Sequence, residues 1–373
     1  MFALLLLSAP PSIPACDPDP APPPPQTGEV LTAADGTRFR VEIVASDLHI
    51  VWSLVFAPDG RLFFTERPGR VRIIQNGQLL NTPALTLTDV FTQSEAGLLG
   101  MALHPEFTRN GLIYLVYTAT VPGASPVNRL ARFREANNTL AQGVVLLDGI
   151  RGNTIHDGSR LRFGPDGKLY MTMGDAAVPS LSQDLASYNG KILRLNDDGT
   201  TPRDNPFASP VYSYGHRNPQ GIDWHPVSGD LWGTEHGQIG NDEINVIEAR
   251  HNYGWPSIEG SATAPGMDTP ILFFTPAIAP SGASFYTGSV FPTFRHNFFV
   301  GALGGLHLLR VRLDPADPRR VIGQERLLEG RFGRIRDVVT GPDGALYLST
   351  SNRDGRYTPA ANDDRILRIV PAN

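Results

Sequence analysis

Cysteine and lysine are almost missing from this chain of 373 residues. Cys16 is the only cysteine, so neither an internal disulfide framework nor a cysteine-rich metal site can form. Lys168 and Lys191 are the only lysines among 32 basic residues, which leaves little room for a Schiff-base or phosphate-binding lysine. After the first 29 residues no apolar run approaches the roughly 18 residues that cross a bilayer. The net charge of −5 gives no electrostatic reason to expect a nucleic-acid partner.

The N-terminus has the composition of a targeting segment. Residues 1–15 form a short apolar stretch that resembles a signal peptide, and residues 16–29 form a Pro-rich tether. Residues 13–16 loosely resemble a bacterial lipobox, in which Cys16 would carry a lipid anchor, and cleavage without a lipid is the alternative. Both interpretations predict a periplasmic or secreted protein whose folded domain spans residues 30–373.

Glycine and proline are abundant, with 38 and 33 residues, and many of them fall in one repeated pattern. Six segments combine a turn with a short apolar or aromatic run, as in Ala57–Phe63 and Gly164–Tyr170. Pro presets the first position of such a turn and Gly relieves the third. The prolines of the six turns are Pro58, Pro105, Pro165, Pro226, Pro292 and Pro342. Their spacing averages about 57 residues, roughly one four-stranded blade with a long loop, which predicts an all-β, six-bladed β-propeller of four-stranded antiparallel sheets.

The loops between the repeats carry the candidate functional residues. His156 precedes the strand expected around 161–163, and Asp175 follows the next strand, so a hairpin would bring them together. A carboxylate beside an imidazole suits a general base, although a surface histidine is the alternative. Arg217, Arg334 and Arg336 would either converge on a planar anionic ligand or form ordinary salt bridges between blades.

Candidate oxygen ligands for a metal, and the absence of several catalytic motifs, reduce the number of reactions that the sequence allows. Asp242, Glu243 and the carbonyl of Tyr253 are of the kind that calcium prefers, although acidic loops are commonly only solvated. No nucleophile elbow, CxxC, HExxH or glycine-rich dinucleotide loop occurs. From the residues alone, the reaction stays open.

Two long motifs resemble a known family. Residues 214–221 read YGHRNPQG and residues 252–256 read NYGWP, and the segments 97–105 and 190–206 fit the same pattern. From about Val51 to Val370 the chain is similar to the soluble quinoprotein glucose and aldose sugar dehydrogenases. The resemblance implies a six-bladed propeller that binds pyrroloquinoline quinone (PQQ) and calcium. It also implies oxidation of an aldose sugar at C1 to the lactone.

The resemblance assigns roles to individual residues. His156 would be the general base that removes the C1 hydroxyl proton as hydride passes to the quinone, Asp175 would orient it, and Arg217 would stabilise charge on the quinone oxygens. The residues implied to bind the cofactor are Glu95, Asn218, Arg334 and Arg336. The ligands implied for calcium are the carbonyls of Gly237 and Gln238 at the cofactor, and Glu243 with the Tyr253 carbonyl at a second, structural ion. Electrons would pass to a separate acceptor, a quinone or cytochrome, because no haem-attachment motif is present.

Three positions depart from the pattern of the glucose dehydrogenases it resembles. Glu95 stands where they have a glutamine, Gly304 where they have a lysine, and Ile155 where they have an aspartate. Loss of one cation would weaken binding of a tri-anionic cofactor by about 1 to 3 kcal/mol. Two alternatives therefore stand beside the dehydrogenase: a calcium-dependent propeller lactonase or hydrolase, and a non-catalytic propeller that binds carbohydrate or protein. The three arginines favour the dehydrogenase.

Overall fold

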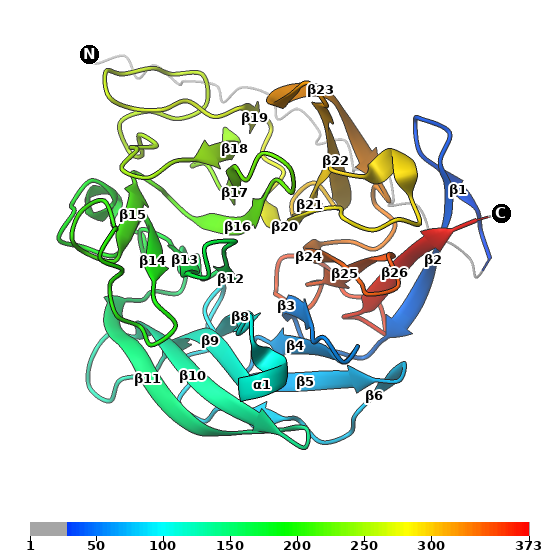
Figure 1. Ribbon diagram of the computed structural model, residues 1–373, viewed down its shortest axis with the longest axis horizontal. Coiled ribbons are helices and arrows are strands. Elements are labelled where there is room, and N and C mark those ends of the chain that lie inside the picture. Colours follow the sequence, from blue (N-terminus) through cyan, green and yellow to red (C-terminus); the bar gives the residue numbers. More distant parts are fainter. Residues whose placement is uncertain (1–27, 373) are drawn as a thin grey trace, which may run out of the picture.

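Six antiparallel β-sheets lie in a ring around a central axis (Figure 1) in the computed structural model, which describes residues 28–372. This arrangement confirms the six-bladed β-propeller predicted from the repeated turns. The signal-like residues 1–15 and the candidate lipid-anchor position, Cys16, lie outside the described residues. No helix within residues 28–372 is long and apolar enough to cross a membrane.

The blades are numbered here in chain order. Blade 1 contains β3 (Val51–Phe56), β4 (Leu62–Glu66), β5 (Arg70–Gln75) and β6 (Gln78–Leu79), and β7 (Leu85–Thr86) also pairs with β5. Blade 2 contains β8 (Leu98–Leu103), β9 (Leu112–Ala119), β10 (Val127–Ala136) and β11 (Thr139–Arg151). Blade 3 contains β12 (Leu161–Phe163), β13 (Leu169–Met173), β14 (Lys191–Leu195) and β15 (Val211–Tyr214).

The second half of the ring is built in the same way. Blade 4 contains β16 (Pro219–Trp224), β17 (Leu231–Glu235), β18 (Asp242–Ile247) and β19 (Leu272–Phe274). Blade 5 contains β20 (Pro280–Phe285), β21 (Phe298–Ala302), β22 (His307–Asp314) and β23 (Asp317–Leu327). Blade 6 contains β24 (Ile335–Thr340), β25 (Leu346–Thr350), β26 (Ile366–Pro371), β2 (Arg38–Ala45) and β1 (Leu31–Thr32).

The repeated turns follow the innermost strand of each blade. In blade 1, Gly60 has φ 86° and the side chain of Asp59 accepts the Arg61 amide at 3.1 Å. Blade 3 repeats this geometry, since Asp166 accepts the Lys168 amide at 3.0 Å. The proline, aspartate and glycine of the motif thus each serve the turn itself. The face of the ring that carries these turns is called the turn face, and the opposite one the loop face.

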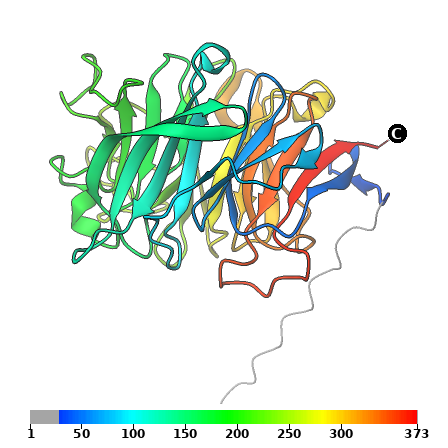
Figure 2. The same ribbon diagram turned by 90° about the horizontal axis from the view of Figure 1, so that it is seen from below.

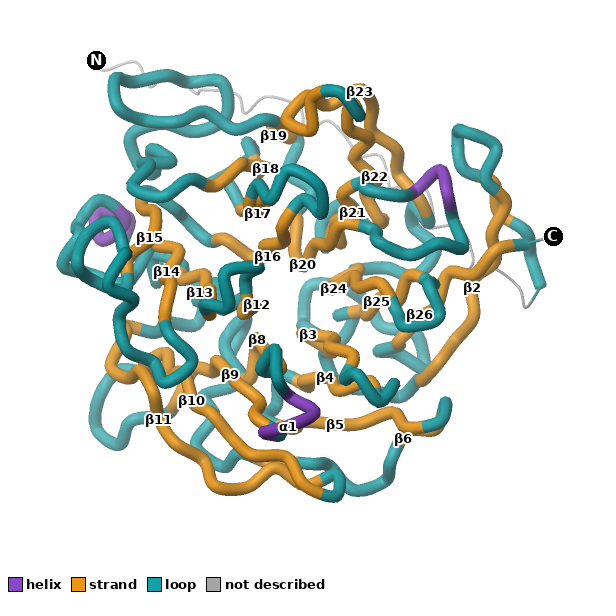
Figure 3. Tube along the Cα trace, viewed as in Figure 1, coloured by secondary structure: helices purple, strands orange, loops and turns teal. Residues whose placement is uncertain are grey.

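Helices are confined to three short segments of the described chain (Figure 3). They are α1 (Phe107–Asn110), η1 (Pro179–Ser182) and η2 (Pro292–Phe294). In the side view, α1 and η2 lie at the turn face, and the loop between β25 and β26 extends from the loop face (Figure 2).

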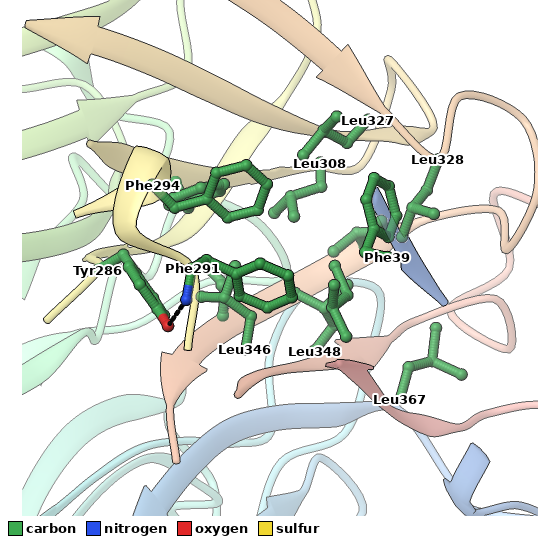
Figure 4. Close-up of a cluster of buried hydrophobic side chains, with 14 of the residues drawn as sticks. Phe39, Tyr286, Phe291, Phe294, Leu308, Leu327, Leu328, Leu346, Leu348 and Leu367 are labelled. Atoms are coloured by element: carbon green, nitrogen blue, oxygen red, sulfur yellow. Dashed lines mark hydrogen bonds between the residues drawn. The ribbon is translucent and has the colours of Figure 1, made fainter. Parts of the chain in front are cut away.

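Blade 6 closes the ring by joining the two ends of the described chain. Strand β2 pairs with β26, so that Phe39 lies opposite Pro371 and Val41 opposite Ile369. The interface of blades 5 and 6 is a hydrophobic core in which Phe39 packs among leucine side chains such as Leu348 and Leu367 (Figure 4). Similar buried clusters lie elsewhere around the ring, which holds the inner strands rigidly around the axis.

Candidate active site

A cavity of about 190 Å³ lies at the loop face, where the inner strands begin. Each of the six blades, or the loop that leads into it, contributes to its wall, so the lining comes from segments far apart in the sequence. The lining residues are Trp52, Glu95, Leu99, Asp157, Gly158, Gln220, His236, Ala279, Leu303, Arg334, Arg336 and Arg356. We call this the loop-face cavity.

His156 and Asp175 meet beside this cavity. The Nδ1 atom of His156 lies 2.7 Å from Oδ1 of Asp175, the contact that the hairpin argument predicts. The other carboxylate oxygen, Oδ2, accepts the indole N–H of Trp255 at 2.9 Å. Asp175 is fully buried, so these contacts hold its carboxylate in place. With Nδ1–H donating to Asp175, Nε2 of His156 is left as a proton acceptor.

The backbone brings this pair together by an unusually close approach. A Cβ at Gly174 would lie 2.0 Å from the carbonyl oxygen of His156, so only glycine fits there. His156 itself has φ 63°, in the left-handed region that few residues other than glycine adopt. Such backbone strain persists only where the surroundings enforce it, and it is concentrated at functional sites.

Glu95 connects the histidine loop to the cavity. Its Oε2 accepts the His156 amide at 3.0 Å and the Asn218 side-chain amide at 3.4 Å, and its Oε1 lies 3.0 Å from Nη1 of Arg356. Burial raises the pKa of Glu95, but the charges of His236 and Arg356 and the bond from the His156 amide together hold it below its ordinary value. The carboxylate is therefore charged, and Arg356 neutralises it.

Arg334 and Arg336 project into the cavity from the start of β24. Nε of Arg334 bonds to Asp354 at 2.8 Å, whereas Arg336 lies 3.7 Å from that carboxylate. Within the described chain, Nε of Arg336 is buried without a hydrogen-bond partner. Burial lowers the pKa of Arg336, and Asp354 only partly opposes this. An anion in the cavity would satisfy both the free donor and the buried charge.

Arg217 is not part of the same wall. It lines a neighbouring, much smaller pocket, and His236 borders both spaces. Nη1 of Arg217 donates to the His236 carbonyl at 3.2 Å, and its guanidinium lies 5.3 Å from the ring centre of Trp255. The structure therefore brings Arg334 and Arg336 together. It places Arg217 in the wall of the smaller pocket, next to Trp255, whose indole donates to Asp175.

Asn218 and Gln220 fix the floor on the blade 4 side. Oδ1 of Asn218 accepts the Gly158 amide and the Gln220 side-chain amide, both at 3.1 Å. Gly304 lies at the edge, after Leu303, and its amide bonds to the Ile278 carbonyl at 2.9 Å. A Cβ at Gly304 would come within 3.3 Å of that backbone.

Three of the four expected calcium ligands line the smaller pocket, and the fourth, Gln238, does not. Glu243, Tyr253 and Gly237 line it together with Glu235 and Glu259, so three carboxylates border one small space. Burial first, and then the charge of Glu235, raise the pKa of Glu243. The amides of Gly237 and Gln238 bond to Asp242 and Glu259, at 2.9 and 2.8 Å. Within residues 28–372, no group of three or more His, Cys, Asp or Glu side chains is arranged to hold a metal ion.

The sequence argument missed three residues of this site. Arg356 pairs with Glu95 from the irregular loop between β25 and β26. Trp255 lies in the NYGWP motif. Its indole contact with Asp175 joins blades 3 and 4, and no pattern in the neighbouring sequence predicts it. Asp157 follows His156, and its Oδ2 is buried at the cavity with no hydrogen-bond partner in the described part of the chain. Burial, with Glu95 nearby, raises the pKa of Asp157 to about 7.

The donor set of the loop-face cavity fits a planar anionic cofactor such as PQQ. Among residues 28–372, Nε of Arg336 and Nε2 of His236 are buried at its wall without hydrogen-bond partners, and Arg334 and Arg356 add charge. The smaller pocket presents carboxylate oxygens of the kind that calcium prefers, although within residues 28–372 they are not arranged as a metal site. Together with a base held by a buried carboxylate, the arrangement can remove a proton next to a bound anion.

Comparisons with known proteins agree with this arrangement. The family model described as Glucose / Sorbosone dehydrogenase matches residues 48–360. The chain is 32% identical over 373 residues to the aldose sugar dehydrogenase YliI of Escherichia coli K12, covering 92% of this chain and 95% of that protein. It is 34% identical over 364 residues to an uncharacterized Synechocystis protein, covering 87% of each. The structure of the PQQ-bound form of aldose sugar dehydrogenase from Streptomyces coelicolor matches with a TM-score of 0.80 at 33% identity, covering 89% of this chain and 98% of that one.

Proposed function

The chain belongs to the glucose/sorbosone dehydrogenase family, and from this premise we propose that it is a PQQ- and calcium-dependent aldose sugar dehydrogenase. The reaction would convert the C1 hydroxyl and its carbon to the carbonyl of a lactone, releasing two electrons and two protons. The observation that carries the proposal is the His156–Asp175–Trp255 chain beside a cavity in which, among the described residues, the cationic donor Nε of Arg336 is buried without a hydrogen-bond partner.

In this proposal His156 is the general base. Its contact with Asp175 turns Nδ1 away from substrate and leaves Nε2 to accept the C1 hydroxyl proton. Asp175 orients the ring and stabilises the imidazolium that forms, and Trp255 fixes the carboxylate in turn. The side chain of His156 is 12% exposed, so the base is shielded from bulk water.

The remaining residues would hold the cofactor and the metal. When bound, PQQ would supply the quinone that accepts the hydride, and calcium would supply a Lewis acid. Arg334 and Arg336 would bind carboxylates, Asn218 and Glu95 would contact the cofactor, and Arg217 would contribute positive charge. Glu243, the Tyr253 carbonyl, and the carbonyls of Gly237 and Gln238 would bind calcium.

Location and electron transfer complete the proposal. The signal-like and Pro-rich residues 1–29 support a periplasmic or secreted enzyme, with Cys16 as a site for a lipid anchor. Electrons would leave through a separate quinone or cytochrome, since the chain has no haem-attachment motif.

Reconstitution tests the function directly. Purified protein incubated with PQQ and Ca²⁺ should reduce a redox dye with D-glucose or another aldose, and EDTA should abolish the reaction. His156→Ala should lower kcat by about 10²- to 10⁴-fold, the usual contribution of a general base. The matched control is His49→Ala, since His49 is exposed. Hydrolysis of a lactone without dye reduction would point to the hydrolase, and the absence of both reactions and of PQQ binding to a non-catalytic propeller.

A further inference from the structure

A second and larger cavity opens at the turn face of the same central channel. Its volume is about 470 Å³, against about 190 Å³ for the loop-face cavity. All six inner strands contribute residues, most of them towards the C-terminal end of the strand, so the cavity lies opposite the site described above. Its volume lies within the range of small-molecule sites, about 300 to 1,000 Å³. We call it the turn-face cavity.

A buried ion pair forms its floor. Nη1 of Arg160 lies 3.1 Å from Oδ2 of Asp337, and the two residues are 2% and 1% exposed. The ring of Trp52, which lines the loop-face cavity, covers the guanidinium at 4.2 Å. The pair and this ring therefore separate the two cavities, and a ligand of one does not need the other.

One donor and one acceptor of this floor are unsatisfied. Within the described chain, Nη2 of Arg160 and Oδ1 of Asp337 are buried without hydrogen-bond partners. Both atoms face Gly282, where a Cβ would be 2.6 Å from the first and 1.9 Å from the second, so they are packed against the backbone of β20. Other parts of the two side chains line the cavity, and a hydroxyl group suits a floor made of a guanidinium and a carboxylate because it both accepts and donates.

The walls add a second charge pair and several aromatic rings. Arg162 lies 3.5 Å from Asp223, so the two arginines and two aspartates of the cavity balance in charge. This balance disfavours a strongly charged ligand. The aromatic residues of the wall are Phe56, Phe107, Phe163, Trp224 and Phe285. Such rings offer apolar surface to the C–H faces of a ring compound.

We propose that the turn-face cavity binds a neutral, hydroxyl-rich ring compound of monosaccharide size, with its hydroxyl groups on the Arg160–Asp337 floor and its carbon face against the aromatic wall. The site is separate from the loop-face cavity. It goes beyond the proposed function and stands whether or not the protein oxidises sugars.

Binding of methyl α-D-glucopyranoside to the cofactor-free protein tests the proposal, because its blocked C1 prevents oxidation. Ligand-observed NMR titration gives the affinity, and crystals soaked in the glucoside show its position. Trp224→Leu and Arg162→Gln, two changes at the cavity wall, should each weaken binding about tenfold, equivalent to about 1.4 kcal/mol. Arg356→Gln, at the rim of the loop-face cavity, is the matched control and should leave the affinity within about twofold.

The outcomes separate the two cavities. Succinate, a dianion of smaller size, should bind more weakly than the glucoside if the charge-balanced floor selects neutral ligands. Thermal unfolding of each variant checks that the fold is kept, and the soaked crystals give a readout that needs no variant. Binding that only Arg356→Gln weakens, glucoside density confined to the loop-face cavity, or no binding at about 100 mM would overturn the proposal.

Discussion

At the scale of single residues, the raised pKa of Asp157 predicts how the stability of the protein depends on pH. Burial raises its pKa to about 7 in the folded protein from an ordinary value of 3.8. Between these values the folded state holds a proton that the unfolded state has released, so stability falls as pH rises towards 7 and then levels off. Asp157→Asn keeps the shape without the titration, and should flatten this part of the pH profile. Urea unfolding of the cofactor-free protein at several pH values between 5 and 8 measures the difference.

Asp157→Asn should also be the more stable protein at pH 8, by an amount on the order of 1 to 3 kcal/mol, because a neutral amide replaces a buried carboxylate whose Oδ2 has no partner within the described chain. Asp148→Asn serves as the control, since Asp148 is exposed. Burial raises the pKa of Asp148, but its contact with Arg129 outweighs this and lowers the pKa. Parallel pH profiles for wild type and Asp157→Asn would show that Asp157 does not hold the proton.

At the scale of a structural element, the repeated turn makes a prediction about backbone conformation. Gly60 has φ 86°, and a Cβ there would have nothing within 4 Å, so a substitution is opposed by conformation alone. Gly60→Ala should lower the free energy of unfolding by about 1 to 2 kcal/mol. Gly60→Asn should lower the free energy of unfolding by less than Gly60→Ala does, because asparagine tolerates the left-handed region. Urea denaturation of both variants measures this order, and equal losses would mean that something other than φ selects glycine.

The elements also show what a sequence can and cannot reveal. Pairing of His156 with Asp175 was predictable because both flank one hairpin, where chain order sets the geometry. The pairing of Arg356 with Glu95 was not, because it joins an irregular loop near the end of the chain to the entrance of blade 2. The separation of Arg217 from Arg334 and Arg336 depends on how blades 4 and 6 pack around the axis, and no local pattern records that.

At the scale of the whole molecule, ring closure makes a prediction about stability. The number of blades followed from the spacing of the prolines, but the pairing of β2 with β26 did not, because β2 lies before the first repeat. Phe39 points from β2 into the core, whereas Ile43 on the same strand is 59% exposed. Phe39→Ala should lower the free energy of unfolding by about 3 to 5 kcal/mol.

Ile43→Ala is the control within the strand and should change this free energy by less than about 0.5 kcal/mol, as is usual for surface positions. Guanidinium denaturation followed by tryptophan fluorescence compares the two variants. Similar losses for Phe39→Ala and Ile43→Ala would mean that β2 adds little to closure.

Blade 6 draws its strands from both ends of the polypeptide. During translation, β24 and β25 therefore emerge late. Strand β2 cannot pair with β26 until β26 has left the ribosome. A premature stop between β25 and β26 would leave the ring open, with β25 and β2 as two unpaired strand edges, and such edges favour aggregation. Truncated products of this gene should accumulate as insoluble material, with no partially active fragment among them.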